Sequence, residues 1–312
     1  MSDHSTHVLF APPVRKDGLL LRGVVATDGP WRIDDELDRD LWAILQFFHS
    51  PVVPRFSEGI DLYVTSPNFA QQTPQPQVLF TDRDLVDENE YHPIPVEKRY
   101  DVVFNVNWLP FKRHELLIEA MVWAKMRGRP LRCLWFGYHY NELWKGRDAM
   151  LRREVHYRGL DVTFADTDFD PSVVNRRYNE SHCALNCSDY EGGPRTMSES
   201  MLADVPFVVT RDTFGGCPLL IDPSAGIACG NDPQSIAEAI WTTVDQPQLF
   251  SPRAWALQNM CRRVALLRLK DALIRLQDST DRRINIAGLD LYGYDWEGEK
   301  RLACKMEQSL SG

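Results

Sequence analysis

The sequence of 312 residues has no long hydrophobic run and no excess of basic residues. Its longest apolar runs are about six residues, whereas a membrane-spanning helix needs about 20. The N-terminus, Met1-Ser2-Asp3-His4-Ser5, has neither the basic nor the apolar region of a signal peptide, so we expect none. The 35 basic residues are outnumbered by 44 acidic ones, and the net charge of −9 argues against a broad DNA-binding face.

The sequence also lacks the cysteine pattern of a disulfide framework. Seven cysteines, an odd number, predict reduced thiols in a cytoplasmic protein rather than a disulfide framework. Cys183 and Cys187 have no partner pair at zinc-like spacing, so we interpret them as buried strand thiols. Asp-x-Asp pairs are about as frequent as the aspartate content predicts by chance, and we infer no metal: they lie at 38/40, 82/84, 166/168 and 168/170.

The composition is that of a globular protein. Hydrophobic residues make up 44% and charged residues 25%, which excludes disorder as the dominant state. At about 150 residues per domain, the length predicts two domains. The sequence changes character near residue 100, so we expect an N-terminal domain at 1–99 and a second domain at 100–250. We expect C-terminal helices at 251–312 that pack on the second domain, with a tail that crosses back to the N-terminal domain.

Residues 1–99 are irregular, with many Pro and Asp residues and short apolar stretches. Alternation predicts strands at 7–11, within 19–27 and at 60–65, a loop at 71–77, and a segment at 41–48 that begins as a helix and ends as a strand.

From Tyr100 onward, apolar strands alternate with helices. We expect strands at 101–106, 131–136, 161–164, 183–187 and 206–210, and helices at 114–125, 141–156, 171–182, 194–203, 232–244 and 252–278. This order predicts an α/β fold with a parallel sheet covered on both faces. Such sheets bind ligands at the carboxyl ends of their strands.

The segment 188–209 carries the clearest chemical signal. A strand ends near Ser188, a glycine turn follows, and Pro194 begins a helix. Exposed N–H groups and the positive end of the helix dipole then form an anion site around 193–196. Glu191 and Glu199 flank this site, and carboxylates accept hydrogen bonds from the paired hydroxyls of a ribose or a hexose.

This segment resembles the retaining GT-B glycosyltransferases of family 4, whose donor domain carries Glu-x7-Glu before a small-x-Pro-Val-Val sequence. Glu191 and Glu199 match the pair, and Val205 stands where glycine is usual. The resemblance implies that Glu191 contacts the transferred sugar and Glu199 the nucleotide ribose. It also implies that the turn and helix start bind the donor, through Gly192, Gly193 and Thr196.

A second motif agrees with the first. Val106-Asn107-Trp108-Leu109-Pro110-Phe111-Lys112, followed by Leu117-Ile118-Glu119-Ala120, is similar to the family's Gly-Arg-Leu-x3-Lys segment. Lys112 matches the diphosphate-binding Lys. Asn107 replaces the Arg and can hydrogen-bond a phosphate oxygen but brings no charge. Arg195 is the candidate for the missing cation, whereas we expect Arg113 to face solvent.

Two downstream pieces and a weaker N-terminal one complete the resemblance. Residues 214–218 are similar to the family's Gly-Gly-x-Pro turn, and 225–240 to its closing segment, so the match covers about 98–246. Upstream, His49 before Gly59-Ile60-Asp61 is similar to the family's catalytic His, which faces the transferred sugar. The 99-residue acceptor domain is abbreviated relative to the family.

Each of these residues also has an ordinary interpretation. The two Glu residues and Lys112 could be solvated surface groups, and His49 could be a core residue. Arg195 could simply begin a helix, although a cation there is unfavourable without an anion nearby. Gly215 and Gly216 could form a plain turn.

The resemblance implies a GT-B fold, with two Rossmann-like domains that face a cleft and an N-terminal one that is reduced. It implies a cytoplasmic, metal-independent enzyme that transfers a sugar, with retention, from a nucleotide diphosphate sugar to a hydroxyl acceptor. No cofactor is expected beyond this co-substrate. Two alternatives stay open: a degenerate sugar-nucleotide-binding subunit, and a glycosyltransferase with a nucleic-acid acceptor. The base, the sugar and the acceptor (small molecule, glycan or nucleic acid) are not specified by the sequence.

Overall fold

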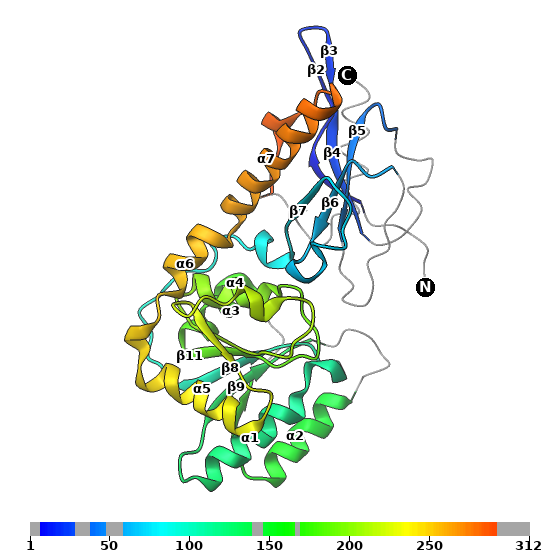
Figure 1. Ribbon diagram of the computed structural model, residues 1–312. Coiled ribbons are helices and arrows are strands. Elements are labelled where there is room, and N and C mark those ends of the chain that lie inside the picture. The colour runs from blue at the N-terminus through cyan, green and yellow to red at the C-terminus, as the bar shows by residue number, and fades with distance from the viewer. Residues whose placement is uncertain (1–6, 29–37, 48–58, 139–145, 166–168, 292–312) are drawn as a thin grey trace. The chain divides into compact units, whose positions relative to one another are not determined.

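The computed structural model describes residues 7–28, 38–47, 59–138, 146–165 and 169–291. The chain divides into two compact units (Figure 1). Unit 1 combines Met1–Leu85 with Arg262–Gly312, and unit 2 comprises Val86–Cys261. Residues 86–99, which the sequence placed with the N-terminal domain, therefore belong to unit 2.

Unit 1 is built on a five-stranded sheet with the order β1-β4-β5-β6-β7. β1 runs antiparallel to β4, and the other neighbours are parallel. The strands are β1 (His7–Ala11), β4 (Gly23–Asp28), β5 (Trp42–Phe47), β6 (Leu62–Thr65) and β7 (Gln77–Leu79), with a separate hairpin of β2 (Val14–Lys16) and β3 (Leu19–Leu21). The short 3-10 turns η1 (Pro67–Phe69) and η2 (Asp82–Leu85) flank β7.

β5 is strand throughout, whereas the sequence suggested that 41–48 begins as a helix. Residues 42–46 are buried, and the strand pairs with a neighbour on each side. A continuous apolar run suits both a buried strand and a buried helix, and here the sheet partners decide the outcome.

The expected helix at 252–278 is two helices, α6 (Pro252–Asn259) and α7 (Arg262–Thr280). Met260 between them leaves the helical conformation, with φ −154° and ψ 69°, and both Met260 and Cys261 are fully buried. The break lets each helix bury its own apolar face: α6 contacts α4 (Arg195–Leu202) of unit 2, while α7 packs on the sheet of unit 1. The sequence predicted one helix packed on the second domain, and for α7 this expectation is wrong.

α7 and the residues after it supply much of the unit 1 core. Ala265, Leu269 and Leu273 of α7 pack in one cluster with strand residues such as Leu45 and Val64. Beyond α7, the backbone on either side of Ile284 pairs with Arg22, through N–H···O distances of 2.9 and 2.8 Å, and η7 (Ile286–Gly288) follows. The C-terminal segment thus completes the reduced N-terminal domain.

Unit 2 carries a six-stranded, fully parallel sheet with the order β10-β9-β8-β11-β12-β13. The strands are β8 (Tyr100–Asn105), β9 (Arg132–Phe136), β10 (Asp161–Phe164), β11 (Ser181–Asn186), β12 (Phe207–Thr210) and β13 (Gly226–Cys229). This is the doubly wound order, in which the chain reverses direction between β8 and β11. The predicted parallel α/β fold is confirmed.

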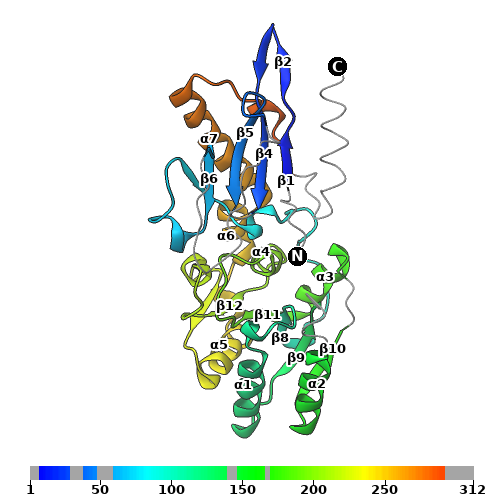
Figure 2. The same cartoon turned by 90° about the vertical axis from the view of Figure 1, so that its right-hand side faces the viewer.

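Helices cover both faces of this sheet (Figure 2). One face is covered by α1 (His114–Met126), α2 (Arg147–Tyr157) and α5 (Pro233–Asp245), whose apolar residues share a cluster with the strands. α3 (Pro171–Asn179) and α4 cover the other face. Asp232 caps α5 as predicted, because its side chain accepts the Ser235 N–H at 2.9 Å.

Cys183 and Cys187 are buried thiols at β11, as predicted. The Cys183 thiol donates to the Asp101 carbonyl at 3.4 Å. Burial raises the pKa of each thiol to about 12, which keeps both protonated at neutral pH.

A buried histidine begins α1. The His114 ring is parallel to the indoles of Trp108 and Trp135, each with centroids 5.5 Å away, and meets Phe104 edge to face. Burial, reinforced by the charge of Arg147, lowers the pKa of His114 to about 3 from its ordinary 6.5. The imidazole is therefore neutral in the native state across the physiological range.

We expect His114→Phe to reduce the decrease in the free energy of unfolding as the pH falls. Between pH 6.5 and about 3 the unfolded chain binds a proton at His114 and the native state does not. This contribution lowers the free energy of unfolding by about 1.4 kcal/mol per pH unit as the pH falls, and it is absent above pH 6.5. Urea unfolding at pH 7 and pH 4 measures the slope, with the exposed His156→Gln as the control. Equal slopes in wild type and His114→Phe would contradict the burial effect.

Candidate functional site

Two loops meet where the sheet of unit 2 reverses direction. One follows β8 and contains η3 (Pro110–Lys112), and the other follows β11. The Asp189 N–H donates to the Phe111 carbonyl at 2.7 Å, and the rings of Phe111 and Tyr190 stack with centroids 4.2 Å apart. Ligands bind at this crevice in open α/β sheets, so its position makes it the candidate site.

Lys112 and Glu191 form an ion pair across these loops, although they are 79 residues apart in the sequence. Their side chains are 11% and 14% exposed, so both groups are largely shielded but reachable. The Ser188 hydroxyl also donates to Glu191, at 3.4 Å. The structure thus brings together the two residues that the sequence matched to separate motifs.

A third loop fixes the backbone of Glu191. The Glu191 N–H donates to the Phe214 carbonyl at 2.6 Å, and the Cys217 N–H donates to the Glu191 carbonyl at 3.0 Å. Gly215 allows this approach, because it has a φ of +107° and a Cβ there would lie 2.7 Å from the Glu191 carbonyl oxygen. The Gly-Gly turn is therefore part of the support for Glu191.

Arg113 does not face solvent as the sequence suggested. Its backbone is left-handed, with a φ of 51°, and its side chain is only 17% exposed. The guanidinium joins the ends of several strands by donating to the Cys187 carbonyl, to Thr210 at 2.8 Å, to Asp212 at 3.2 Å and to Asn231 at 2.8 Å. These contacts fasten the Lys112 loop to the sheet edge.

Glu199 lies inside α4 and is 7% exposed. It accepts a hydrogen bond from the Tyr178 hydroxyl at 3.0 Å and lies 3.5 Å from the Arg195 guanidinium. Burial raises the pKa of the Glu199 carboxyl, and Arg195, Tyr178 and Tyr91 oppose that rise. The partner that the structure gives Arg195 is therefore Glu199.

The remaining predicted donor residues lie at the start of α4 and after β8. Pro194 is the N-cap of α4 and provides no side-chain cap; Gly192 and Gly193 precede it, and Thr196 lies in the first helical turn. Asn107 uses its side-chain oxygen within its own loop, accepting the Leu109 N–H at 3.3 Å. His49 lies outside the described residues.

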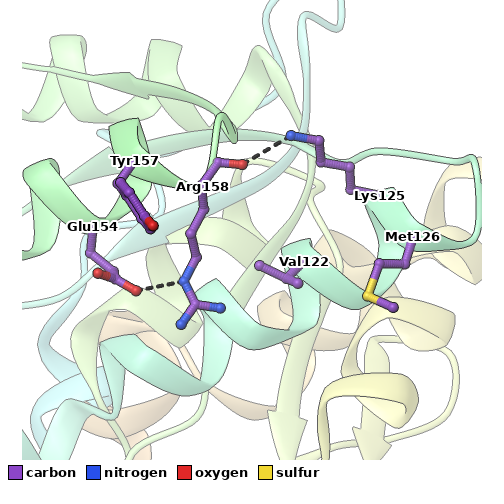
Figure 3. A pocket seen from close by; sticks show the side chains of 6 residues that line it. All are labelled: Val122, Lys125, Met126, Glu154, Tyr157 and Arg158. Carbon is purple, nitrogen blue, oxygen red and sulfur yellow. Dashed lines mark hydrogen bonds and ion pairs between the residues drawn. The ribbon is translucent and has the colours of Figure 1, made fainter.

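A pocket of about 580 Å³ lies elsewhere in unit 2, between the ends of α1 and α2 (Figure 3). Its charged residues already have partners: Lys125 donates to the carbonyls of Arg158 and Gly159 at 2.9 and 2.8 Å, and Arg158 pairs with Glu154. Lys125 thus stabilises the C-terminal end of α2, and we assign the pocket no ligand.

The described ranges contain no group of three or more His, Cys, Asp or Glu side chains placed to hold a metal ion. Among the helices of those ranges, none has the length and hydropathy needed to cross a membrane.

Residues 100–246 match the family model described as Glycosyl transferases group 1. Comparison with curated protein sequences gives no match. Solved structures give many matches.

Three of the structural neighbours illustrate the likeness. Sucrose-phosphate synthase from Thermosynechococcus elongatus is 15% identical, with a TM-score of 0.64 over 82% of this chain and 74% of its own. HepE from Anabaena, in complex with UDP and glucose, is 16% identical, with a TM-score of 0.60 over 75% and 72%. TarM from S. aureus, in a complex that includes UDP, is 13% identical, with a TM-score of 0.59 over 77% and 52%.

These likenesses, with one mostly parallel and one fully parallel sheet, define a GT-B fold whose N-terminal domain is reduced. Within it, residues 100–246 form a glycosyltransferase domain of group 1.

Proposed function

We propose that the chain transfers a sugar from a nucleotide diphosphate sugar to a hydroxyl acceptor, with retention and without a metal ion. The observation that carries the proposal is the pairing of Lys112 with Glu191 at the reversal point of a group 1 glycosyltransferase domain. A cation for the diphosphate and an acceptor for sugar hydroxyls then lie side by side.

Lys112 and the N-terminus of α4 supply positive charge where the leaving diphosphate develops negative charge. Glu191 accepts hydrogen bonds from the hydroxyls of the transferred sugar, and Glu199 from those of the ribose. These groups do the electrostatic work that a metal ion does in other transferases.

In the proposed reaction the bond between the anomeric carbon and the phosphate oxygen breaks as the acceptor oxygen bonds to the same face of the carbon. The acceptor proton passes to the departing phosphate oxygen. Retention follows from attack on the same face, and no protein nucleophile is needed.

The test is thermal unfolding with UDP, GDP, ADP, CMP and dTDP, with and without sugars, in buffer containing EDTA. UDP is the first to try, since the HepE and TarM complexes contain it. Saturation at 100 times Kd adds about 2.7 kcal/mol, or roughly 5 °C in Tm. The shift is expected to disappear in Lys112→Ala and Glu199→Ala. A wild-type protein that shifts with no nucleotide at millimolar concentration contradicts the donor site.

We also propose a cytoplasmic location, supported by the buried thiols of Cys133, Cys183, Cys187 and Cys229.

A further inference from the structure

Glu199 is a buried charge that three segments surround. Tyr178 comes from α3, Arg195 from the first turn of α4, and Tyr91 from the segment that precedes β8. A buried carboxylate is costly unless it is paired and hydrogen-bonded, so these contacts keep Glu199 in one place.

The hydrogen bond of Tyr178 has a fixed direction. The Asn105 side-chain amide donates to the Tyr178 hydroxyl oxygen at 2.9 Å, and an amide nitrogen can only donate. The hydroxyl proton is thereby directed to Glu199, 3.0 Å away on the other side. The Tyr178 ring is fully buried, which holds the donor in place.

Tyr91 approaches the same carboxylate from another direction. Its side chain helps to lower the pKa of the Glu199 carboxyl, and its ring meets that of Tyr178 edge to face, with centroids 6.5 Å apart. The Tyr91 carbonyl accepts a hydrogen bond from Arg253 of α6 at 2.8 Å. Arg253 also donates to the carbonyl of Leu202, the last residue of α4, so one guanidinium ties Tyr91 to the helix that carries Glu199.

The segment around Tyr91 is docked on α3. Asn175 accepts the His92 N–H at 3.1 Å, and Asn179 accepts the Ile94 N–H at 2.9 Å. Tyr91 lies before the 100–246 domain, yet it belongs to unit 2. The group 1 domain therefore takes one partner of Glu199 from outside its own boundaries.

We propose that Tyr178 and Tyr91 are positioning residues that hold the Glu199 carboxylate for the ribose hydroxyls of the nucleotide, an inference that rests on the proposed function. The Tyr178 hydroxyl occupies one lone pair of the carboxylate, which offers about four, and Tyr91 packs against Tyr178 beside the same group. The remaining lone pairs face a ligand only while both tyrosines fix the orientation of the group.

The test compares ribose with 2′-deoxyribose. The Kd values of UDP, GDP and ADP and of their 2′-deoxy forms are measured by calorimetry for wild type, Tyr178→Phe, Tyr91→Phe and Glu199→Gln. Tyr157→Phe removes a hydroxyl that is far from the site, on a residue that is 87% exposed, and serves as the matched control. We expect wild type and Tyr157→Phe to prefer the ribose form by roughly tenfold, and the other three variants to lose most of this preference.

The outcomes separate the two levels of the proposal. If the wild-type protein binds none of the six nucleotides, the proposed function fails. If wild type prefers ribose and both tyrosine variants keep the full preference, the positioning role is wrong and the donor site stands. Equal weakening of both forms, together with a lower Tm, shows that the tyrosines act only on stability and also overturns the inference.

Discussion

Replacing Lys112 by alanine is expected to lower kcat for sugar transfer by about 10²- to 10³-fold, the typical cost of removing one preorganised donor at a developing negative charge. Lys112 is 11% exposed, so bulk water does not replace its ammonium efficiently. The variant also leaves Glu191 without its ionic partner beside the diphosphate, which adds repulsion. Donor binding is expected to weaken as well, because the cation acts on the ground state too.

Initial rates with a saturating donor measure kcat, and a titration with the nucleoside diphosphate measures Kd. Lys125→Ala is the matched control, since it removes the same charge from the C-terminal end of α1, whereas Lys112 precedes the N-terminal end of that helix. It is expected to leave both constants unchanged. Turnover by Lys112→Ala within threefold of the wild-type rate would show that Lys112 is an ordinary surface residue.

The regular alternation from Tyr100 onward made unit 2 predictable from the sequence. Strands such as β8 and β12 are apolar runs, and helices such as α5 begin at a recognisable signal, here Asp232 before Pro233. Two motifs that follow β8 and β11 had to meet once the strand order was doubly wound, because these strands are neighbours. The contact between Lys112 and Glu191 was therefore within reach of a sequence argument.

Unit 1 was less predictable, because its strands acquire their partners from distant segments. α7 covers a sheet formed about 200 residues earlier, and no local pattern records that assignment. The boundary at Cys261–Arg262 depends on which apolar face each helix buries, and helical spacing alone does not reveal this.

Within the site, Arg113 and Tyr178, which position other residues of the site, were not identified from the sequence. Arg113 looked like a surface residue because it follows Lys112 in a polar stretch, yet its left-handed backbone turns the side chain toward the strand ends. Tyr178 fits an amphipathic helix as an ordinary core residue, and only its hydroxyl contact with Glu199 shows a second role. Aromatic spacing on a helix identifies burial and not hydrogen bonding.

Glu191→Gln is expected to lower kcat by about 10²-fold while nucleoside diphosphate binding stays as tight or tightens. Glutamine preserves the shape of the side chain. It replaces one of the two accepting oxygens by a donating NH2 group and removes the negative charge that strengthens the hydrogen bonds from the sugar hydroxyls. The same change releases Lys112 from its ion pair and leaves its charge available to the diphosphate. Since a partly exposed ion pair is worth at most about 1 kcal/mol, the gain in affinity is up to about fivefold.

The opposite signs expected for Lys112→Ala and Glu191→Gln distinguish a phosphate ligand from a sugar ligand. Calorimetry with the nucleoside diphosphate gives the two Kd values, and Glu154→Gln on α2 controls for the loss of one carboxylate. In the double variant the two effects on Kd are not additive. The gain in affinity from Glu191→Gln requires the Lys112 ammonium, which the double variant lacks. If Glu191→Gln instead weakens binding of the nucleoside diphosphate as strongly as Lys112→Ala does, the two residues act as one structural unit. The assignment of Glu191 to the sugar is then wrong.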